Sequence, residues 1–220
     1  MNIIKKNKFF LFISLLISVS ILLAMLTRFS IKEISFSSVL NELKTYPFYL
    51  SYPQEVYLET FDDLEENSDV IALVEPTDEK KVLGDSIITK IKVKNSLKGD
   101  IEDYIYIVEP ISLHYEKYTN PTSRYISSIF GYNFMKSDKE YIVLLNESNN
   151  IYNSKEVYIY TNVYLGKFPR IYNKYDYNIL DNNSNNTYEN ISSYEQLFNN
   201  NVEFDYYSDI YNNIILKYSL

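Results

Sequence analysis

Residues 87–94 read Ile87-Ile88-Thr89-Lys90-Ile91-Lys92-Val93-Lys94, and this stretch decides the fold class. At the odd positions from Ile87 to Val93 the side chains are apolar or short. At positions 90, 92 and 94 they are lysines. Successive side chains of a β-strand point to opposite faces of the sheet, so this alternation is typical of a half-buried strand. The stretch therefore predicts a strand that turns one face to a hydrophobic core.

Other short apolar stretches lie on both sides of this strand. We expect buried strands at residues 70–74 and 141–145, a further strand at 104–108, an alternating strand at 157–164, and a shorter one at 56–59. These stretches are not separated by regular helical patterns, which favours antiparallel pairing over a parallel sheet. The sequence therefore predicts a mainly β fold, a small antiparallel OB-like barrel.

Helices are expected at two places in this part of the chain. Residues 61–67 predict a short acidic helix, and Ser192-Ser193-Tyr194-Glu195 fits a capping box that would begin another. Apolar side chains then recur every three or four residues from Phe204 to Tyr218, which predicts a C-terminal helix with one apolar stripe.

The N-terminal part of the chain contains a charge-free, mostly apolar run, Phe9–Leu26, preceded by three lysines and followed by Arg28. A helix over this run would be about 27 Å long, close to the hydrocarbon thickness of about 30 Å. A cleaved signal peptide shares these features. Because the exit from Ala24 to Arg28 lacks a small-x-small cleavage site, we expect an uncleaved signal anchor.

The positive-inside rule orients this anchor, since Lys5, Lys6 and Lys8 precede it. We expect a cytoplasmic stub at residues 1–8, a transmembrane segment at 9–27, a stalk at 28–52 and an extracytoplasmic domain at 53–220. The predicted location is the cell membrane, with the C-terminal domain outside.

The part of the chain after Arg28 is strongly acidic, with 29 acidic residues against 17 basic ones. Such a domain is repelled by nucleic acid and by anionic lipid, so nucleic acid is not an expected partner. The chain has no cysteine, which excludes a disulfide scaffold and a thiol nucleophile. The fold must therefore rest on a hydrophobic core.

A resemblance to known domains supports the OB-like prediction. The residues that carry it are Ser68–Val74, Ile88–Val93, Leu97-Lys98-Gly99-Asp100, Tyr104–Ile107 and Met135–Leu145. In that order they resemble exported bacterial OB-like domains, similar in outline to netrin and metalloproteinase-inhibitor modules. The inhibitors of that class use a cysteine at a free amino terminus, which this chain lacks. The resemblance therefore implies a fold more than a mechanism.

Catalytic motifs are missing from the sequence. The chain has one histidine, His114, so it cannot form the two-histidine helix of zinc proteases. It has neither a glycine-rich phosphate loop nor a Gly-x-Ser-x-Gly elbow. Paired carboxylates could hydrolyse glycosides, but spacing alone selects no pair. We expect a protein that is not an enzyme and uses no cofactor.

Two groups of residues were considered as binding sites. The acidic cluster at residues 62–69 offers oxygen ligands for calcium, although a solvated helix face explains it more simply. Tyr158, Tyr160 and Tyr164 are predicted to form an aromatic stripe on an exposed sheet face, where rings can stack on sugars or grip a peptide. This stripe is the ligand surface that the sequence favours.

These patterns together predict a membrane-anchored, non-catalytic binding or accessory module at the cell envelope. Its expected partner is a cell-wall polymer or a basic protein. Two alternatives stay open: an inhibitor or immunity-type protein that binds a secreted protease or toxin, and a wall-polymer hydrolase.

Overall fold

The computed structural model describes residues 3–30, 33–51, 59–114, 124–152, 155–171, 173–180 and 186–219. The chain divides into two compact units, Met1–Glu33 and Ile34–Leu220. The first contains one apolar helix, and the second is mainly β with a C-terminal helix. This coarse architecture confirms the prediction from sequence.

The first unit consists of helix α1, Ile3–Ser30. Its segment Phe10–Thr27 is long and apolar enough to cross a membrane, a test that a signal sequence also meets. The hydroxyls of Ser18 and Ser20 donate to the carbonyl oxygens four residues earlier, each at 2.9 Å. The hydroxyls of these two serines are therefore satisfied within the helix, as the apolar interior of a membrane would require.

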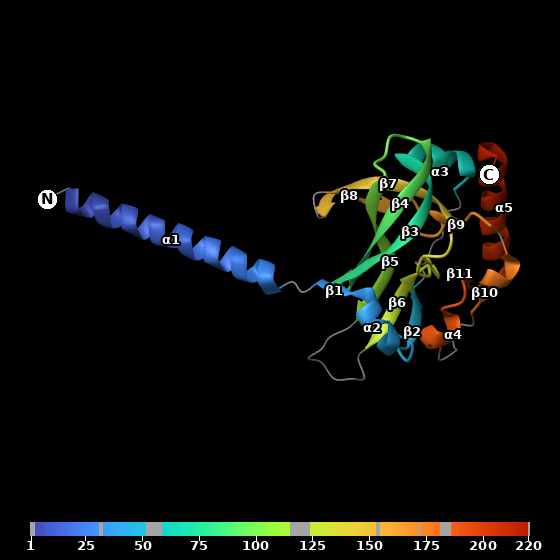
Figure 1. Cartoon of the computed structure of the whole chain (residues 1–220), viewed down its shortest axis with the longest axis horizontal. Coiled ribbons are helices and arrows are strands. Elements are labelled where there is room, and N and C mark those ends of the chain that lie inside the picture. The colour runs from blue at the N-terminus through green and yellow to red at the C-terminus, as the bar shows by residue number, and fades with distance from the viewer. Residues whose placement is uncertain are drawn as a thin grey trace. The chain divides into compact units, whose positions relative to one another are not determined.

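The second unit contains a nine-stranded sheet, a two-stranded sheet and several helices (Figure 1). The strands of the large sheet are β1 Glu33–Ser35, β2 Phe48–Ser51, β3 Val70–Leu83, β4 Ser86–Lys98, β5 Tyr104–His114, β6 Tyr125–Ile129, β7 Tyr141–Tyr152, β8 Lys155–Tyr160 and β9 Lys167–Pro169. The small parallel sheet pairs β10 Tyr177–Ile179 with β11 Gln196–Phe198. The helices are α2 Phe36–Leu43, α3 Phe61–Asn67, the 3-10 helix η2 Lys174–Asp176, α4 Tyr188–Ile191 and α5 Asn201–Tyr218.

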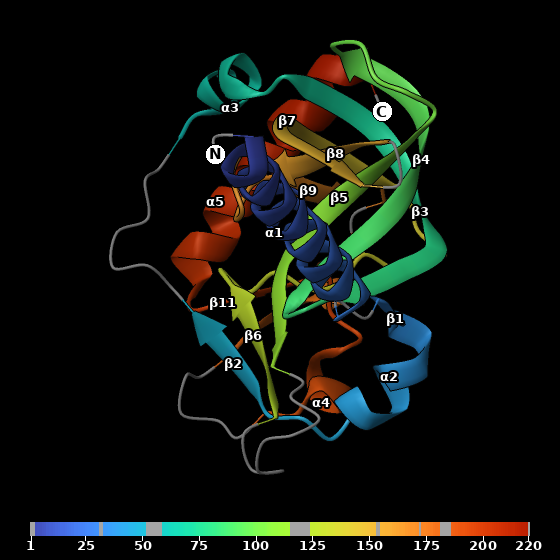
Figure 2. The same cartoon turned by 90° about the vertical axis from the view of Figure 1, so that its left-hand side faces the viewer.

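The strand pairings form a closed circuit. From β3 the hydrogen-bonded neighbours run through β4, β5, β8 and β7 and return to β3. All of these pairs are antiparallel except β5 with β8. Beside the circuit, β6 pairs with β5 and β2 pairs with β6, so β5, β6 and β2 lie side by side (Figure 2).

The core forms on both sides of β3. Val70, Ala72 and Val74 belong to the largest buried cluster, whereas Ile71 and Leu73 belong to a second cluster. That second cluster also contains the buried face of α5. Because both faces of β3 are covered, its sequence is continuously apolar where a half-buried strand would alternate. The strand β7 is buried on both faces in the same way.

Helix α3 begins and ends where the sequence predicted, at Phe61 and Asn67. Its N-cap is Thr60, whose hydroxyl accepts from the backbone N–H of Asp63 while the Asp63 carboxylate accepts from that of Thr60. The capping box predicted at Ser192 is wrong. Helix α4 ends there, and Glu195 is buried among lysines instead of capping a helix.

The segment predicted as a stalk, residues 28–52, differs in the structure. The second compact unit begins at Ile34, and Val39, Leu43 and Phe48 of this segment lie in the largest core cluster. The apolar spacing within α2 is the sequence signal that this helix packs on the core. The prolines at 47 and 53 obscured that signal because they argue against a long helix. The strand predicted at 56–59 falls largely on residues 52–58, outside the described part of the chain.

This difference predicts how truncated domains behave. Burial of Val39, Leu43 and Phe48 contributes about 5–9 kcal/mol, compared with a typical domain stability of about 5–15 kcal/mol. We expect a fragment of residues 34–220 to unfold cooperatively in urea and a fragment of residues 53–220 to show no cooperative transition. Equal midpoints for the two fragments would contradict the assignment of α2 and β2 to the core.

Candidate functional site

The tyrosine stripe predicted from the sequence is not on the surface. The exposed fractions of Tyr158, Tyr160 and Tyr164 are 1%, 6% and 3%, whereas Ile159 is 42% exposed. The strand predicted at 157–164 ends at Tyr160, and its faces are the reverse of the prediction, with Tyr158 and Tyr160 inside and Ile159 outside. Tyr164 lies beyond the strand, in the second core cluster. These three residues therefore cannot form the exposed aromatic surface that the sequence suggested.

The reason for the reversal is the closed circuit of strands. Tyr158 and Tyr160 point into the cluster enclosed by the circuit, where large rings fill the space between facing strands. The buried Tyr160 hydroxyl lies 3.0 Å from the hydroxyl of Tyr132, and Tyr158 donates to Glu156 at 2.8 Å. A buried tyrosine needs a partner for its hydroxyl: Tyr160 has one in the interior, whereas Tyr158 reaches the exposed Glu156.

The network inside the circuit is centred on Glu109, whose side chain is fully buried. Its Oε1 lies 2.7 Å from Nζ of Lys80, and it also accepts from the Thr89 hydroxyl. Its Oε2 accepts from the Tyr132 hydroxyl at 2.9 Å and from the backbone N–H of Met135 at 3.1 Å. Residues of three strands and one loop therefore meet at a single carboxylate.

The protonation of this network follows from its contacts. Burial alone would raise the pKa of Glu109, but the Lys80 ammonium and the hydrogen bonds outweigh burial and lower that pKa. Burial and the neighbouring Glu109 charge raise the pKa values of Tyr132 and Tyr160 far above normal. Glu109 is therefore ionised at neutral pH, and the tyrosines stay protonated as donors.

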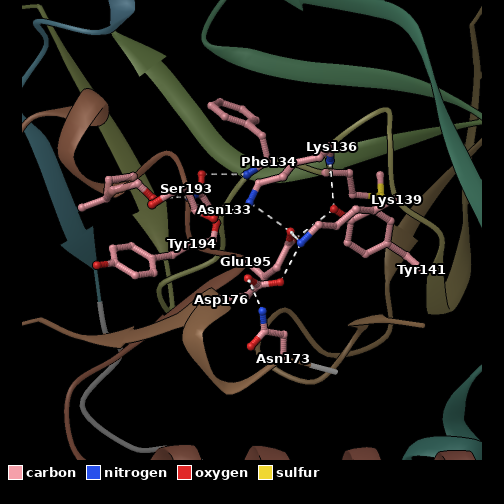
Figure 3. A network of polar contacts seen from close by, with 12 residues as sticks. Asn133, Phe134, Lys136, Lys139, Tyr141, Asn173, Asp176, Ser193, Tyr194 and Glu195 are labelled. Carbon is pink, nitrogen blue, oxygen red and sulfur yellow. Dashed lines mark hydrogen bonds and ion pairs between the residues drawn. The ribbon is translucent and has the colours of Figure 1, made fainter. Parts of the chain in front are cut away.

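A second network surrounds Glu195, which lies just before β11 (Figure 3). Its Oε1 is 3.0 Å from Nζ of Lys136 and 2.9 Å from Nζ of Lys139, while Oε2 accepts from the Tyr141 hydroxyl at 2.9 Å. Lys139 also pairs with Asp176 at 2.6 Å. These contacts tie the loop before β7 to the segment between α4 and β11.

Lys167 of β9 lies next to this network and is also buried. Its Nζ donates to the carbonyl oxygens of Asn133 at 2.5 Å and Glu195 at 3.1 Å, and it lies 4.1 Å from the centre of the Tyr132 ring. Burial lowers the pKa of Lys167 to about 8, despite the nearby acids. The lysine thus bridges two loops at an electrostatic cost.

In both networks the carboxylates belong to internal ion pairs. The carboxylates of Glu109 and Glu195 are each engaged by lysine and tyrosine, and neither side chain has measurable exposure. A general acid or base needs a perturbed pKa together with access to a substrate. A depressed pKa in an enclosed position suits an internal ion pair.

The histidine and the acidic cluster also have structural partners. His114 stacks on Tyr125 with ring centres 4.0 Å apart, and its Nδ1 is 3.7 Å from Asp85. In the acidic cluster, Glu65 pairs with Lys217, and Asp69 accepts from a backbone N–H of β7. Within the described part of the chain, no group of three or more metal-ligating side chains gathers.

A groove that could hold a ligand lies on the outer face of β4 and β5. It has a volume of about 650 Å³, and we call it the Tyr104 groove. Tyr104 is 40% exposed, and the Lys90 ammonium lies 5.5 Å from the centre of its ring. The groove is lined by Lys90, Ile101, Glu102, Asp103, Tyr104, Tyr106 and Lys155.

The charges in this groove are balanced. Lys155 forms an ion pair with Glu102, and Lys90 lies 3.1 Å from Glu79. The same Glu79 accepts from the Tyr106 hydroxyl at 2.9 Å. The groove thus offers donors, acceptors and an aromatic ring without a strong net charge. This combination suits a polar ligand of low charge density.

The sequence predicts only part of this groove. Its patterns place Lys90 on the solvent face of a strand and residues 104–108 in a strand, but they assign no role to Glu102, Asp103 or Lys155. Ile105 lies in the core, so the tyrosines on either side of it face outward. Because Lys90 of β4 pairs with Tyr106 of β5, the outward lysines and the outward tyrosines become neighbours on the sheet.

The Glu109 network yields a stability prediction. We expect Glu109→Gln and Lys80→Met each to lower the free energy of unfolding by about 3–5 kcal/mol, because each leaves a buried charge unpaired. The double variant should lose about 0.5–3 kcal/mol less than the sum of the two. Urea unfolding of the two single variants and the double variant measures these losses. Strictly additive losses would contradict a direct ion pair between Glu109 and Lys80.

Lys167 yields a pH prediction. Its folded pKa of about 8 lies below the unfolded value, so the unfolded chain binds more protons between these two pH values, and stability rises with pH there. Relative to a Lys167→Met variant, the native domain should gain about 2 kcal/mol between pH 7.5 and 9.5. Parallel stability curves for the two proteins would show that Lys167 has an ordinary pKa.

Comparison of the chain with protein-family models, curated proteins and solved structures finds no match. The site must therefore be interpreted from its own geometry.

Proposed function

We propose that this protein is a membrane-anchored, non-catalytic module that binds a polysaccharide of low charge density at the cell envelope. The single observation that carries the proposal is the Tyr104 groove, where an exposed ring is surrounded by balanced charges. In this proposal α1 is an uncleaved signal anchor with a cytoplasmic amino terminus. The unit from Ile34 onward is then an extracytoplasmic domain.

The proposed fold of that domain is an OB-like barrel of the kind found in netrin and metalloproteinase-inhibitor modules. The closed circuit of β3, β4, β5, β8 and β7 supports it, since an OB-fold is a five-stranded, partly open barrel. OB-folds bind oligosaccharides on their second and third strands and the adjoining loops. The second and third strands of this circuit are β4 and β5, which line the Tyr104 groove.

The chemistry of the groove supports a sugar ligand. Sugar rings present apolar faces that can pack on Tyr104, and their hydroxyl groups both donate and accept hydrogen bonds. Lys90 and Lys155 supply donors, while Glu102 and Asp103 supply acceptors. A polyanion would meet two carboxylates here, and the acidic domain as a whole would repel it.

The proposed absence of catalysis rests on the buried acids. Glu109 and Glu195 are neutralised by lysines inside the domain, so they do not flank an accessible glycosidic bond. Glu102 of the groove is paired with Lys155. The groove is therefore better suited to holding a polymer than to cutting it.

A second candidate function is supported by a different groove. This hollow of about 660 Å³ is lined by Glu75, Asp138, Glu140 and Asp176, together with Lys139 and Arg170. Its rim carries Ile171, which is 81% exposed. An excess of carboxylates beside an apolar side chain fits a basic protein partner, as an inhibitor or immunity-type protein would need.

The test of the main proposal is a binding measurement on the domain with peptide-free cell-wall glycan strands. We expect Tyr104→Ala to weaken binding about tenfold, which corresponds to 1.4 kcal/mol, because a stacking surface is lost. The matched control is Tyr175→Ala, which removes a ring that is 77% exposed outside the groove. We also expect no release of new reducing ends.

Three outcomes would contradict the proposal. Native protein that does not bind the glycan excludes the ligand class, and equal losses for both variants exclude the groove. Release of reducing ends that depends on Glu102 would favour the hydrolase instead.

A further inference from the structure

Three aromatic rings form a row on the part of the sheet where β5, β6 and β2 lie side by side. The ring centres of His114 and Tyr125 are 4.0 Å apart, and those of Tyr125 and Tyr49 are 5.4 Å apart. Each ring comes from a different strand, so the row crosses the sheet. We call these three residues the aromatic row.

The aromatic row faces solvent. Its chain neighbours Phe48, Leu113 and Ile126 are buried in the largest core cluster, so alternation places the three rings on the opposite face. Tyr49 is 56% exposed, compared with 40% for Tyr104. Contacts between rings on neighbouring strands stabilise the sheet, but sheet stability alone does not explain why the Tyr49 ring is exposed to water.

The aromatic row and the Tyr104 groove lie on the same face of β5. Tyr104 and His114 are separated by an even number of residues, while Ile105 and Leu113 point into the core. A strand of this length spans about 33 Å between the two positions. The outer face of β5 therefore carries one aromatic feature at each end.

We infer that the aromatic row is a second contact for the same polysaccharide chain that occupies the Tyr104 groove, so that the ligand is a long glycan and not a short oligosaccharide. This inference rests on the proposed function. The row has the chemistry of a sugar-binding platform: its rings are aromatic, Ser112 and Ser127 beside it are small and uncharged, and the Asp85 carboxylate 3.7 Å from Nδ1 of His114 can accept a hydrogen bond from a sugar hydroxyl.

The physical consequence is a dependence on chain length. Once a glycan is held in the groove, its next segment reaches the row at a high effective concentration, so a weak second contact raises the overall affinity. A disaccharide cannot span the strand and gains nothing from the row. A long chain gains from both contacts.

The experiment compares two probes, peptide-free cell-wall glycan strands and the disaccharide obtained from them, on the full chain in detergent. We expect Tyr49→Ala to weaken binding of long strands about tenfold and to leave disaccharide binding unchanged. Tyr104→Ala should weaken binding of both probes. Tyr49→Phe retains the ring and should restore the affinity for long strands, which separates stacking from a hydroxyl contact.

The outcomes distinguish this inference from the proposed function. If Tyr49→Ala leaves long-strand binding unchanged while Tyr104→Ala weakens it, the inference is overturned and the function stands. If Tyr49→Ala weakens both probes equally, the row is a site for short ligands and the inference is again overturned. If the native protein binds neither probe, the proposed function fails and the inference fails with it.

Discussion

A negative charge enclosed by β-strands needs a positive charge and hydrogen-bond donors beside it. The Glu109 carboxylate is such a charge, and the elements of the domain must be arranged so that they supply these partners. The partners are Lys80 from β3, Thr89 from β4 and Tyr132 from the loop before β7. An unpaired buried charge costs several kcal/mol, so these elements are held in one arrangement. The ion pair thus specifies how the strands close as much as it stabilises them.

The same constraint determines which surface is free for recognition. Lys80 and Tyr132 are committed to Glu109, and the loop lysines are committed to Glu195. On the outer sides of β3 and β7, α5 and α3 complete the second core cluster. The outward side chains of β4, β5 and β8 form only a small cluster of strand residues. The outer face of β4, β5 and β8 therefore displays the Tyr104 groove, and the outer face of β5, β6 and β2 displays the aromatic row.

The elements of the fold could be predicted because local patterns determine them. Residues 70–74 are continuously apolar since both faces of β3 are covered, and the helical stripe of α5 follows from burial of Tyr207, Ile210 and Ile214. The helix 61–67 follows from its own cap. Each of these signals lies within a few residues of the element that it predicts.

The site could not be predicted, because it depends on pairing between distant segments. The alternation of β8 is equally strong with either face inward, and the closed circuit is what turns Tyr160 toward Glu109. The sequence around Glu195 fits a helix-capping pattern. In the structure Glu195 is instead buried, where two lysines and one tyrosine from a distant segment bind its carboxylate. Lys90 and Tyr106 become neighbours through strand register, which no short window of sequence contains.

The measurement that tests this account most directly is a titration of the tyrosine-labelled domain with long glycan strands, followed by NMR. The account predicts that the resonances of Tyr104 and Tyr49 shift together and saturate together. Those of the buried Tyr158 and of Tyr175, which is exposed outside the groove, should stay in place. A shift of Tyr175 without shifts of Tyr104 and Tyr49, or no shifts at saturating glycan, would contradict recognition on the outer face of β4 and β5.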